Sequence, residues 1–94
     1  MTIGVLGGGQ LGRMLALAGY PLGFDFVFLD RSPAAPAGQV APLLCADFTD
    51  RQRLAELGAR VDVVTFDWEN VPVEALDALG CPVRPSVAAQ RSRP

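Results

Sequence analysis

The stretch IGVLGGGQLGRMLALAG, residues 3–19, decides the fold, because an apolar run passes through glycines into a helical pattern. Residues 2–6 are short, apolar and rich in β-branched side chains, which predicts a buried strand. From Leu11 the apolar side chains recur at positions 11, 14, 15 and 18, the spacing of a helix that packs one face on a sheet. Gly19 and Pro21 supply its stop signals. The stretch therefore predicts a strand, a glycine turn and a helix.

The alternation of strand and helix patterns continues along the chain. Residues 24–29 predict a second strand that carries Asp30 at its end, and residues 32–38, with two prolines, predict an irregular surface loop. The next predicted elements are a short strand at 43–46 and a helix with Thr49 and Gln52 as its capping box and Gly58 as its stop. A strand at 61–66 follows. The last predicted elements are a helix with Pro72 in its first turn, Leu76 and Leu79 buried and Gly80 at its end, and a brief strand at 81–83. This order predicts an α/β fold: a Rossmann-like parallel sheet with helices on both faces.

Size and composition limit the chain to one domain. Its 94 residues are half hydrophobic and under a fifth charged, so they can bury one core. We expect the domain to occupy residues 1–86 and residues 87–94 to be a poorly ordered tail. The net charge of −2 offers no field for nucleic acid or an anionic membrane, and no apolar run approaches the roughly 20 residues of a membrane span. The expected location is the cytoplasm.

The residue types also restrict the chemistry. All eight basic residues are arginines, and with no lysine or histidine the usual general bases, Schiff-base amines and imidazole metal ligands are missing from the chain. Cys45 and Cys81 stand far apart in sequence, without a CxxC pattern, which favours two buried free thiols over a zinc or redox site. No residue is therefore expected to be catalytic.

The glycine turn is the strongest binding motif. Gly7, Gly9 and Gly12 satisfy GxGxxG, in which the first glycine permits a sharp turn, the second lets a ligand approach and the third allows close helix–sheet contact. The unpaired amides at the start of the helix and its dipole favour an anion there, so a phosphate is the expected ligand. The alternative is that the glycines only make a compact turn.

Two kinds of ligand remain open for this turn. Asp30 lies 18 residues after Gly12, where a dinucleotide-binding domain places its ribose-binding carboxylate. Against a dinucleotide, Asp67 and Glu69 follow the strand at 61–66 and would bring two negative charges to the same edge of the sheet as a diphosphate. A single phosphate on a sugar suits this edge better.

In a sugar-phosphate site the acceptors and donors divide between two segments. Glu69 offers oxygens to hydroxyl or amino groups, while the glycine turn and the amides of Gln10 and Leu11 offer donors. The alternative for the polar segment at 67–70 is a loop in which Asp67 or Asn70 caps the following helix.

The motifs together resemble the N-terminal domain of the 5-(carboxyamino)imidazole ribonucleotide synthase family, also called the ATPase subunit of phosphoribosylaminoimidazole carboxylase. The resemblance runs in order to about residue 90, and GGGQLGRM with FDWENVP is far more specific than GxGxxG. The segments that carry it are GGGQLGRMLALAGYPLG (7–23), LDRSPAAPAGQVA (29–41), ADFTD (46–50), VDVVTFDWENVP (61–72) and VRPS (83–86).

The resemblance implies a pre-ATP-grasp domain of a purine-biosynthesis ligase. Such an enzyme uses ATP and bicarbonate to carboxylate the amine of 5-aminoimidazole ribonucleotide, with ATP and Mg²⁺ on its ATP-grasp part. It implies substrate-binding roles for Gly9, Gln10, Leu11 and Glu69, and the ATP-grasp domain of the same protein as partner. These 94 residues lack the ATP-grasp and C-terminal domains, so we expect a fragment that binds no ATP or metal and is inactive alone.

Three other functions compete with this one. The formate-dependent glycinamide ribonucleotide transformylase has a similar first domain, but its turn typically carries Glu where this chain has Gln10. A plain NAD- or FAD-binding module would place Asp30 on the adenosine ribose. A domain without any ligand, which only contacts other parts of a larger enzyme, is the third.

Overall fold

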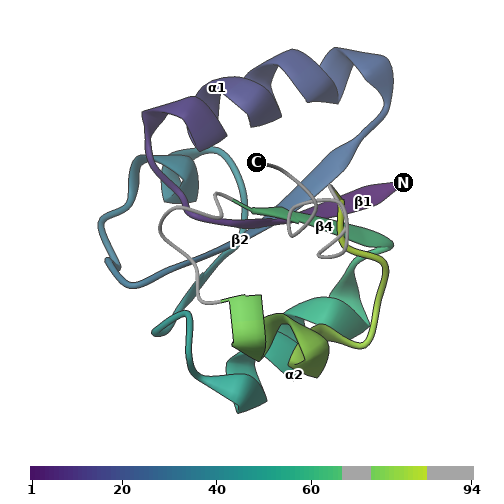
Figure 1. Ribbon diagram of the computed structural model, residues 1–94. Helices are drawn as coiled ribbons and strands as arrows, with labels where there is room; N and C mark the ends of the chain where they lie inside the picture. The colour runs from purple at the N-terminus through teal and green to yellow at the C-terminus, as the bar shows by residue number, and fades with distance from the viewer. Residues whose placement is uncertain (67–72, 85–94) are drawn as a thin grey trace, which may run out of the picture.

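Four parallel strands form the sheet in the computed structural model, which describes residues 1–66 and 73–84 (Figure 1). The order across the sheet is β3-β2-β1-β4, and each neighbouring pair is parallel. The elements are β1 (Thr2–Leu6), α1 (Gln10–Gly19), the 3₁₀ helix η1 (Tyr20–Leu22), β2 (Asp25–Asp30), the 3₁₀ helix η2 (Pro36–Gln39), β3 (Leu43–Cys45), α2 (Arg51–Arg60), β4 (Val63–Phe66) and the 3₁₀ helix η3 (Val73–Leu79).

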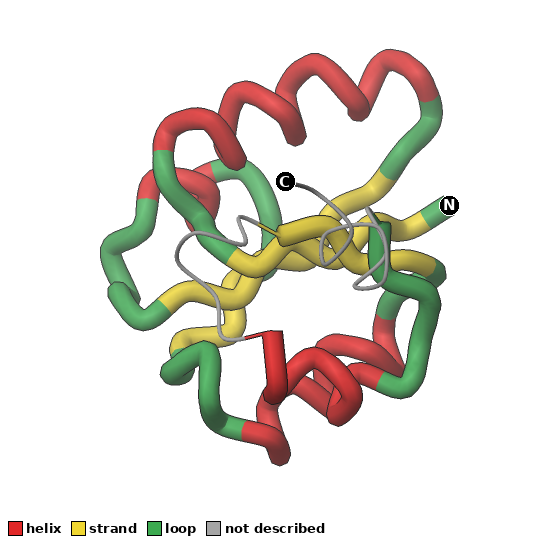
Figure 2. Tube along the Cα trace, in the orientation of Figure 1, coloured by secondary structure: helices red, strands yellow, loops and turns green. Residues whose placement is uncertain are grey.

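Helices cover both faces of the sheet, as the sequence predicted (Figure 2). Side chains of a strand alternate between faces, so β2 sends Phe26 and Phe28 toward α1 and η2, and Val27 and Leu29 toward α2 and η3. Each face carries its own buried cluster. The α/β parallel fold is therefore confirmed, and the carboxyl ends of β1, β2 and β4 meet at one edge.

The predicted face of α1 is wrong. Leu11, Met14, Leu15 and Ala18 were expected to pack on the sheet, yet all four are exposed. The buried residues of α1 are Ala16 and Gly19, and Gly12 lies along the same side.

Aromatic rings on β2 explain this choice of face. A Cβ added to Gly12 would lie 2.9 Å from the Phe28 ring, and one added to Gly19 would lie 2.5 Å from the Phe26 ring. The two rings fill the space between sheet and helix, so only a side of α1 without bulky side chains can approach. Positions 12, 16 and 19 also follow helical spacing. The sequence pattern therefore favoured the larger apolar side chains as the buried face, and the glycine side was not predicted.

The remaining elements differ from prediction mainly at their ends. Residues 32–38 are not wholly irregular, since η2 begins at Pro36, where a proline suits the first turn of a helix. Strand β4 begins at Val63 rather than at residue 61. Of the last predicted strand, Val83 forms an isolated parallel bridge with Val64. Pro72 and residues 85–94, with the predicted tail, lie outside the described residues.

The predicted N-cap and the predicted end of α2 are both wrong. The N-cap is Asp50, whose Oδ1 accepts a hydrogen bond from the Arg53 amide at 3.1 Å, whereas the Thr49 hydroxyl donates to Asp47 at 2.8 Å. Asp50 stands one residue closer to the helix and is as good a cap as Thr49. The helix also continues past Gly58 to Arg60.

Gly58 serves the packing of α2 against η3. A Cβ at this position would overlap the main-chain carbonyl of Leu79. The close approach lets Leu57 of α2 and Leu76 and Leu79 of η3 pack in one buried cluster. Gly80 then ends η3 with φ of +68°, in the left-handed region that the predicted stop requires.

The close approach at Gly58 predicts that two opposite substitutions in α2, glycine to alanine and alanine to glycine, both lower stability. Gly58→Ala should lower the free energy of unfolding by about 2 kcal/mol or more, because overpacking outweighs the roughly 1 kcal/mol gain in helix propensity. Ala55→Gly, at an exposed position of the same helix, should cost about 1 kcal/mol from propensity alone. Urea unfolding followed by circular dichroism measures both, and a stabilising Gly58→Ala would contradict the packing described.

Candidate ligand site at the glycine turn

The turn between β1 and α1 depends on backbone conformations that favour glycine. Gly7 has φ of +114°, and its amide donates to the Leu29 carbonyl at 2.8 Å, so the chain turns sharply beside β2. Gly9 is the N-cap of α1, with open space where a side chain would stand and no side-chain cap. The first amides of α1 are therefore left for solvent or a ligand.

Asp30 holds the turn in place. Its Oδ2 accepts a hydrogen bond from the Gly8 amide at 2.7 Å, and its Oδ1 accepts one from the Ser32 amide at 3.0 Å. The carboxylate thus ties the glycine turn to the end of β2. Its position at that end is the predicted one, but both of its oxygens serve the backbone. These contacts give Asp30 a structural role in the turn that does not depend on a dinucleotide.

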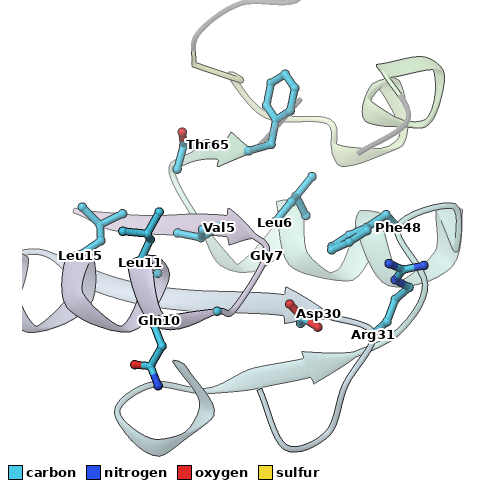
Figure 3. Close-up of a pocket in the computed structure, with 13 residues that line it drawn as sticks. Val5, Leu6, Gly7, Gln10, Leu11, Leu15, Asp30, Arg31, Phe48 and Thr65 are labelled. Carbon is cyan, nitrogen blue, oxygen red and sulfur yellow. The ribbon is translucent and has the colours of Figure 1, made fainter. Parts of the chain in front are cut away.

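A pocket of about 560 Å³ opens beside the turn (Figure 3). Its walls come from the glycine turn, the first turns of α1, the carboxyl ends of the strands and Phe48. Three predicted site residues, Gly9, Gln10 and Leu11, all line it. The lining also includes the aliphatic side chains of Val5, Leu6, Leu11 and Leu15, so the pocket combines an apolar wall with main-chain donors.

The side chains of the predicted pair point in different directions. Leu11 extends to the same side of α1 as Leu15, whereas Gln10 extends to the other side (Figure 3). Phe66 pairs with Leu6, so β4 reaches this edge beside the glycine turn. Glu69, the fourth predicted residue, lies outside the described residues, as do Asp67, Trp68 and Asn70. The structure therefore brings together three of the four predicted site residues.

Arg31 and Phe48 are among the pocket residues to which the sequence assigned no site role. Arg31 follows Asp30 at the end of β2, and its guanidinium carbon lies 5.7 Å from the centroid of the Phe48 ring. Arg31 could have been found from its place one residue after the predicted strand end. Phe48 sits in a polar loop, ADFTD, with no pattern that marks it as a pocket wall. Arg31 supplies a cationic group to a lining that also holds the Asp30 carboxylate.

Hydrogen bonds stabilise the charged form of Asp47, which lies in the loop after β3. The Thr49 amide and hydroxyl, with a smaller effect of Arg31, hold the pKa of Asp47 below its ordinary value. Within residues 1–66 and 73–84, no three His, Cys, Asp or Glu side chains gather to hold a metal ion. Over the same residues, no helix has the length and apolar character needed to cross a membrane.

The expectation of two buried thiols is wrong for Cys45. Both cysteines are free, but Cys45 is exposed on β3 and its Sγ donates weakly to the Arg31 carbonyl at 3.4 Å, while Cys81 is half-buried. Burial raises the pKa of the Cys81 thiol.

The two thiols should therefore differ in reactivity. Because alkylation requires an accessible thiolate, iodoacetamide at pH 8 should modify Cys45 several-fold faster than Cys81. Mass spectrometry of a time course, with Cys45→Ser and Cys81→Ser chains as references, gives the two rates. Equal rates, or a faster Cys81, would contradict the burial described.

Comparison with known proteins places these features in a family. The ribonucleotide synthetase preATP-grasp domain matches residues 1–91. N5-carboxyaminoimidazole ribonucleotide synthase of Pseudomonas aeruginosa is 50% identical over 93 residues, which are 97% of this chain and 26% of that protein.

Solved structures of similar proteins also superpose on this chain. N5-carboxyaminoimidazole ribonucleotide synthetase from Thermus thermophilus superposes with a TM-score of 0.86 at 53% identity, over 95% of this chain and 25% of that one. Glycinamide-RNase-transformylase T from Mycobacterium tuberculosis superposes at 0.82 with 28% identity, over 97% of this chain and 28% of that one. The chain thus spans about a quarter of the length of these relatives.

The role of Asp30 predicts a loss of stability on its removal. Asp30→Ala removes two acceptors and leaves the partly buried Gly8 amide unpaired, so the free energy of unfolding should fall by about 1–3 kcal/mol. Asp30→Asn, which keeps one oxygen, should lose less. The control is Asp25→Asn, at the exposed opposite end of β2. Denaturant unfolding of the three variants measures these differences. An Asp30→Ala chain as stable as the control would show that Asp30 does not stabilise the glycine turn.

Proposed function

The chain belongs to the ribonucleotide synthetase preATP-grasp domain family, and we propose that in a full-length synthase it holds the 5-aminoimidazole ribonucleotide that the enzyme carboxylates. The observation that carries the proposal is the placing of the Gly9, Gln10 and Leu11 backbone in one pocket with the carboxyl ends of β1 and β4. Identity near 50% to named synthases supports it.

The site positions the substrate and moves no proton. The amides of Gln10 and Leu11 donate to oxygen atoms of the sugar phosphate, in the place where the helix dipole favours negative charge. Glu69, three residues after the end of β4, accepts from ribose hydroxyls or the amine. Because the Gln10 side chain lies on the far side of α1 from Leu11, its main-chain amide is the contact (Figure 3).

The remainder of the enzyme supplies the chemistry. Within the described residues no three His, Cys, Asp or Glu side chains gather to hold a metal ion. We place ATP and Mg²⁺ on the ATP-grasp part of the full-length protein, as the resemblance implies. There ATP activates bicarbonate for attack by the amine. What this chain adds is the orientation of the ribonucleotide, and the 94 residues alone are inactive.

Each rival function is weaker for a specific reason. The transformylase relative is 28% identical, against 50% and 53% for the two synthases compared above, and Gln10 stands where that enzyme typically carries Glu. A dinucleotide module would use Asp30 for ribose hydroxyls, whereas here its contacts with the Gly8 and Ser32 amides give it a structural role without that ligand. A domain without ligand gives no role to the pocket beside the glycine turn.

Substitution of Glu69 tests the proposed site. In a full-length synthase that carries this domain in place of its own, Glu69→Ala should weaken ribonucleotide binding by about 1–3 kcal/mol, or roughly 5- to 150-fold, as a charged hydrogen bond is lost. Gln10→Ala should cost less, because the contact is made by the main chain. Calorimetric titration gives the affinities.

The matched control is Glu56→Ala on the exposed side of α2, where Glu56 pairs with Arg53 at 2.8 Å. This variant should bind as tightly as the unmodified protein. A Glu69→Ala protein with unchanged affinity would rule out the assigned role.

A further inference from the structure

Thr65 is the polar member of an otherwise apolar row of side chains that crosses the sheet. It pairs with Val5 of β1, and the row continues through Phe28 of β2 to Leu43 of β3. Val5 and Phe28 belong to the buried cluster under α1 and η2, and Leu43 packs against that cluster. Valine favours a strand as well as threonine does, so strand formation does not require the hydroxyl. A polar group thus stands where packing alone would place an aliphatic side chain.

The Thr65 side chain lies at the aliphatic end of the pocket beside the glycine turn. Three aliphatic side chains line this end with it: Val5, Leu11 and Leu15. Figure 3 shows them well apart from Arg31 and Phe48, which line the other end. Thr65 is half-buried. A hydroxyl among aliphatic side chains is costly to leave unpaired when a ligand excludes water, so a bound ligand must offer it a polar atom.

The other polar side chains of the lining serve different purposes or point elsewhere. Both oxygens of Asp30 accept hydrogen bonds from backbone amides. Gln10 extends to the side of α1 away from the aliphatic end (Figure 3). The guanidinium carbon of Arg31 lies 5.7 Å from the centroid of the Phe48 ring, at the other end of the pocket. Thr65 is therefore the polar side chain that the pocket presents at its aliphatic end.

We propose that the Thr65 hydroxyl recognises the nitrogen-bearing ring of the ribonucleotide and thereby orients its amine. The inference rests on the proposed function, because it takes the ligand to be 5-aminoimidazole ribonucleotide. With the sugar-phosphate oxygens on the amides of Gln10 and Leu11, the flat, uncharged ring extends along the aliphatic end and away from the Arg31 cation. A hydroxyl donates as well as accepts, so it suits a ring that carries both an acceptor nitrogen and an amine.

This contact distinguishes ligands by their ring alone. Ribose 5-phosphate keeps the sugar and the phosphate of the ribonucleotide but has no ring, so it offers no partner to the Thr65 hydroxyl. A site that holds a polar group for one ligand binds the analogue without the matching group less well. Thr65 therefore contributes to the binding of the ribonucleotide and not to that of ribose 5-phosphate.

Calorimetric titration with these two ligands tests the proposal in the full-length synthase that carries this domain in place of its own. Thr65→Val keeps the β-branched shape and removes the hydroxyl. It should weaken binding of the aminoimidazole ribonucleotide by about 5- to 15-fold, as one hydrogen bond is lost. Binding of ribose 5-phosphate should change by less than about twofold. Unchanged affinity for the ribonucleotide, or equal weakening for both ligands, would overturn the proposal.

Two matched variants separate the hydroxyl from the packing of the side chain. Thr65→Ser keeps the hydroxyl, so it should bind the ribonucleotide within about threefold of the unmodified protein. Thr2→Val makes the same chemical change at a half-buried position where β1 begins, at the opposite end of the sheet, and should alter neither affinity. A Thr65→Ser protein as weak as Thr65→Val would show that the methyl group matters instead, which would overturn the proposal.

The unmodified protein separates this inference from the function on which it rests. If it does not bind the aminoimidazole ribonucleotide, the proposed function fails and the role of Thr65 fails with it. If it binds the ribonucleotide and Thr65→Val binds equally well, the proposed function stands and only the role of Thr65 is overturned.

Discussion

The contact of Phe26 and Phe28 with the glycine side of α1 determines the rest of this structure. Because the rings stand between sheet and helix, α1 can approach only through Gly12, Ala16 and Gly19. That approach turns the leucines of α1 outward, and it fixes the start of α1 at the end of β1. The pocket, the free amides of the turn and the exposed leucines of α1 all follow from one choice of helix face.

Strand positions could be predicted from the sequence far better than the orientation of helices. Apolar runs that end in glycine or aspartate locate β1, β2 and β4 because a buried parallel strand is apolar on both faces. The face of α1 could not be predicted, since two sets of positions share helical spacing and the choice depends on rings from a distant segment. Likewise, the sequence pattern at Gly58 is typical of a helix end, whereas its actual role is to let the Leu79 carbonyl of η3 approach α2.

The candidate site could likewise be predicted only in part. GxGxxG located Gly9, Gln10 and Leu11, because backbone donors at a helix start depend on local sequence alone. The role of Asp30 depends on its distance from the Gly8 amide, a contact between residues 22 apart that spacing could not decide. Phe48 enters the pocket from a loop after β3, so only the folded chain shows it.

The central claim is that the glycine turn holds an aminoimidazole ribonucleotide and not a dinucleotide. The most direct measurement is the backbone amide spectrum of the isotopically labelled chain during titration with the ribonucleotide, followed by addition of NAD. The ribonucleotide should shift the resonances of Gly9, Gln10 and Leu11, and NAD should not reverse the shifts. Shifts caused by NAD, with none from the ribonucleotide, would contradict this claim.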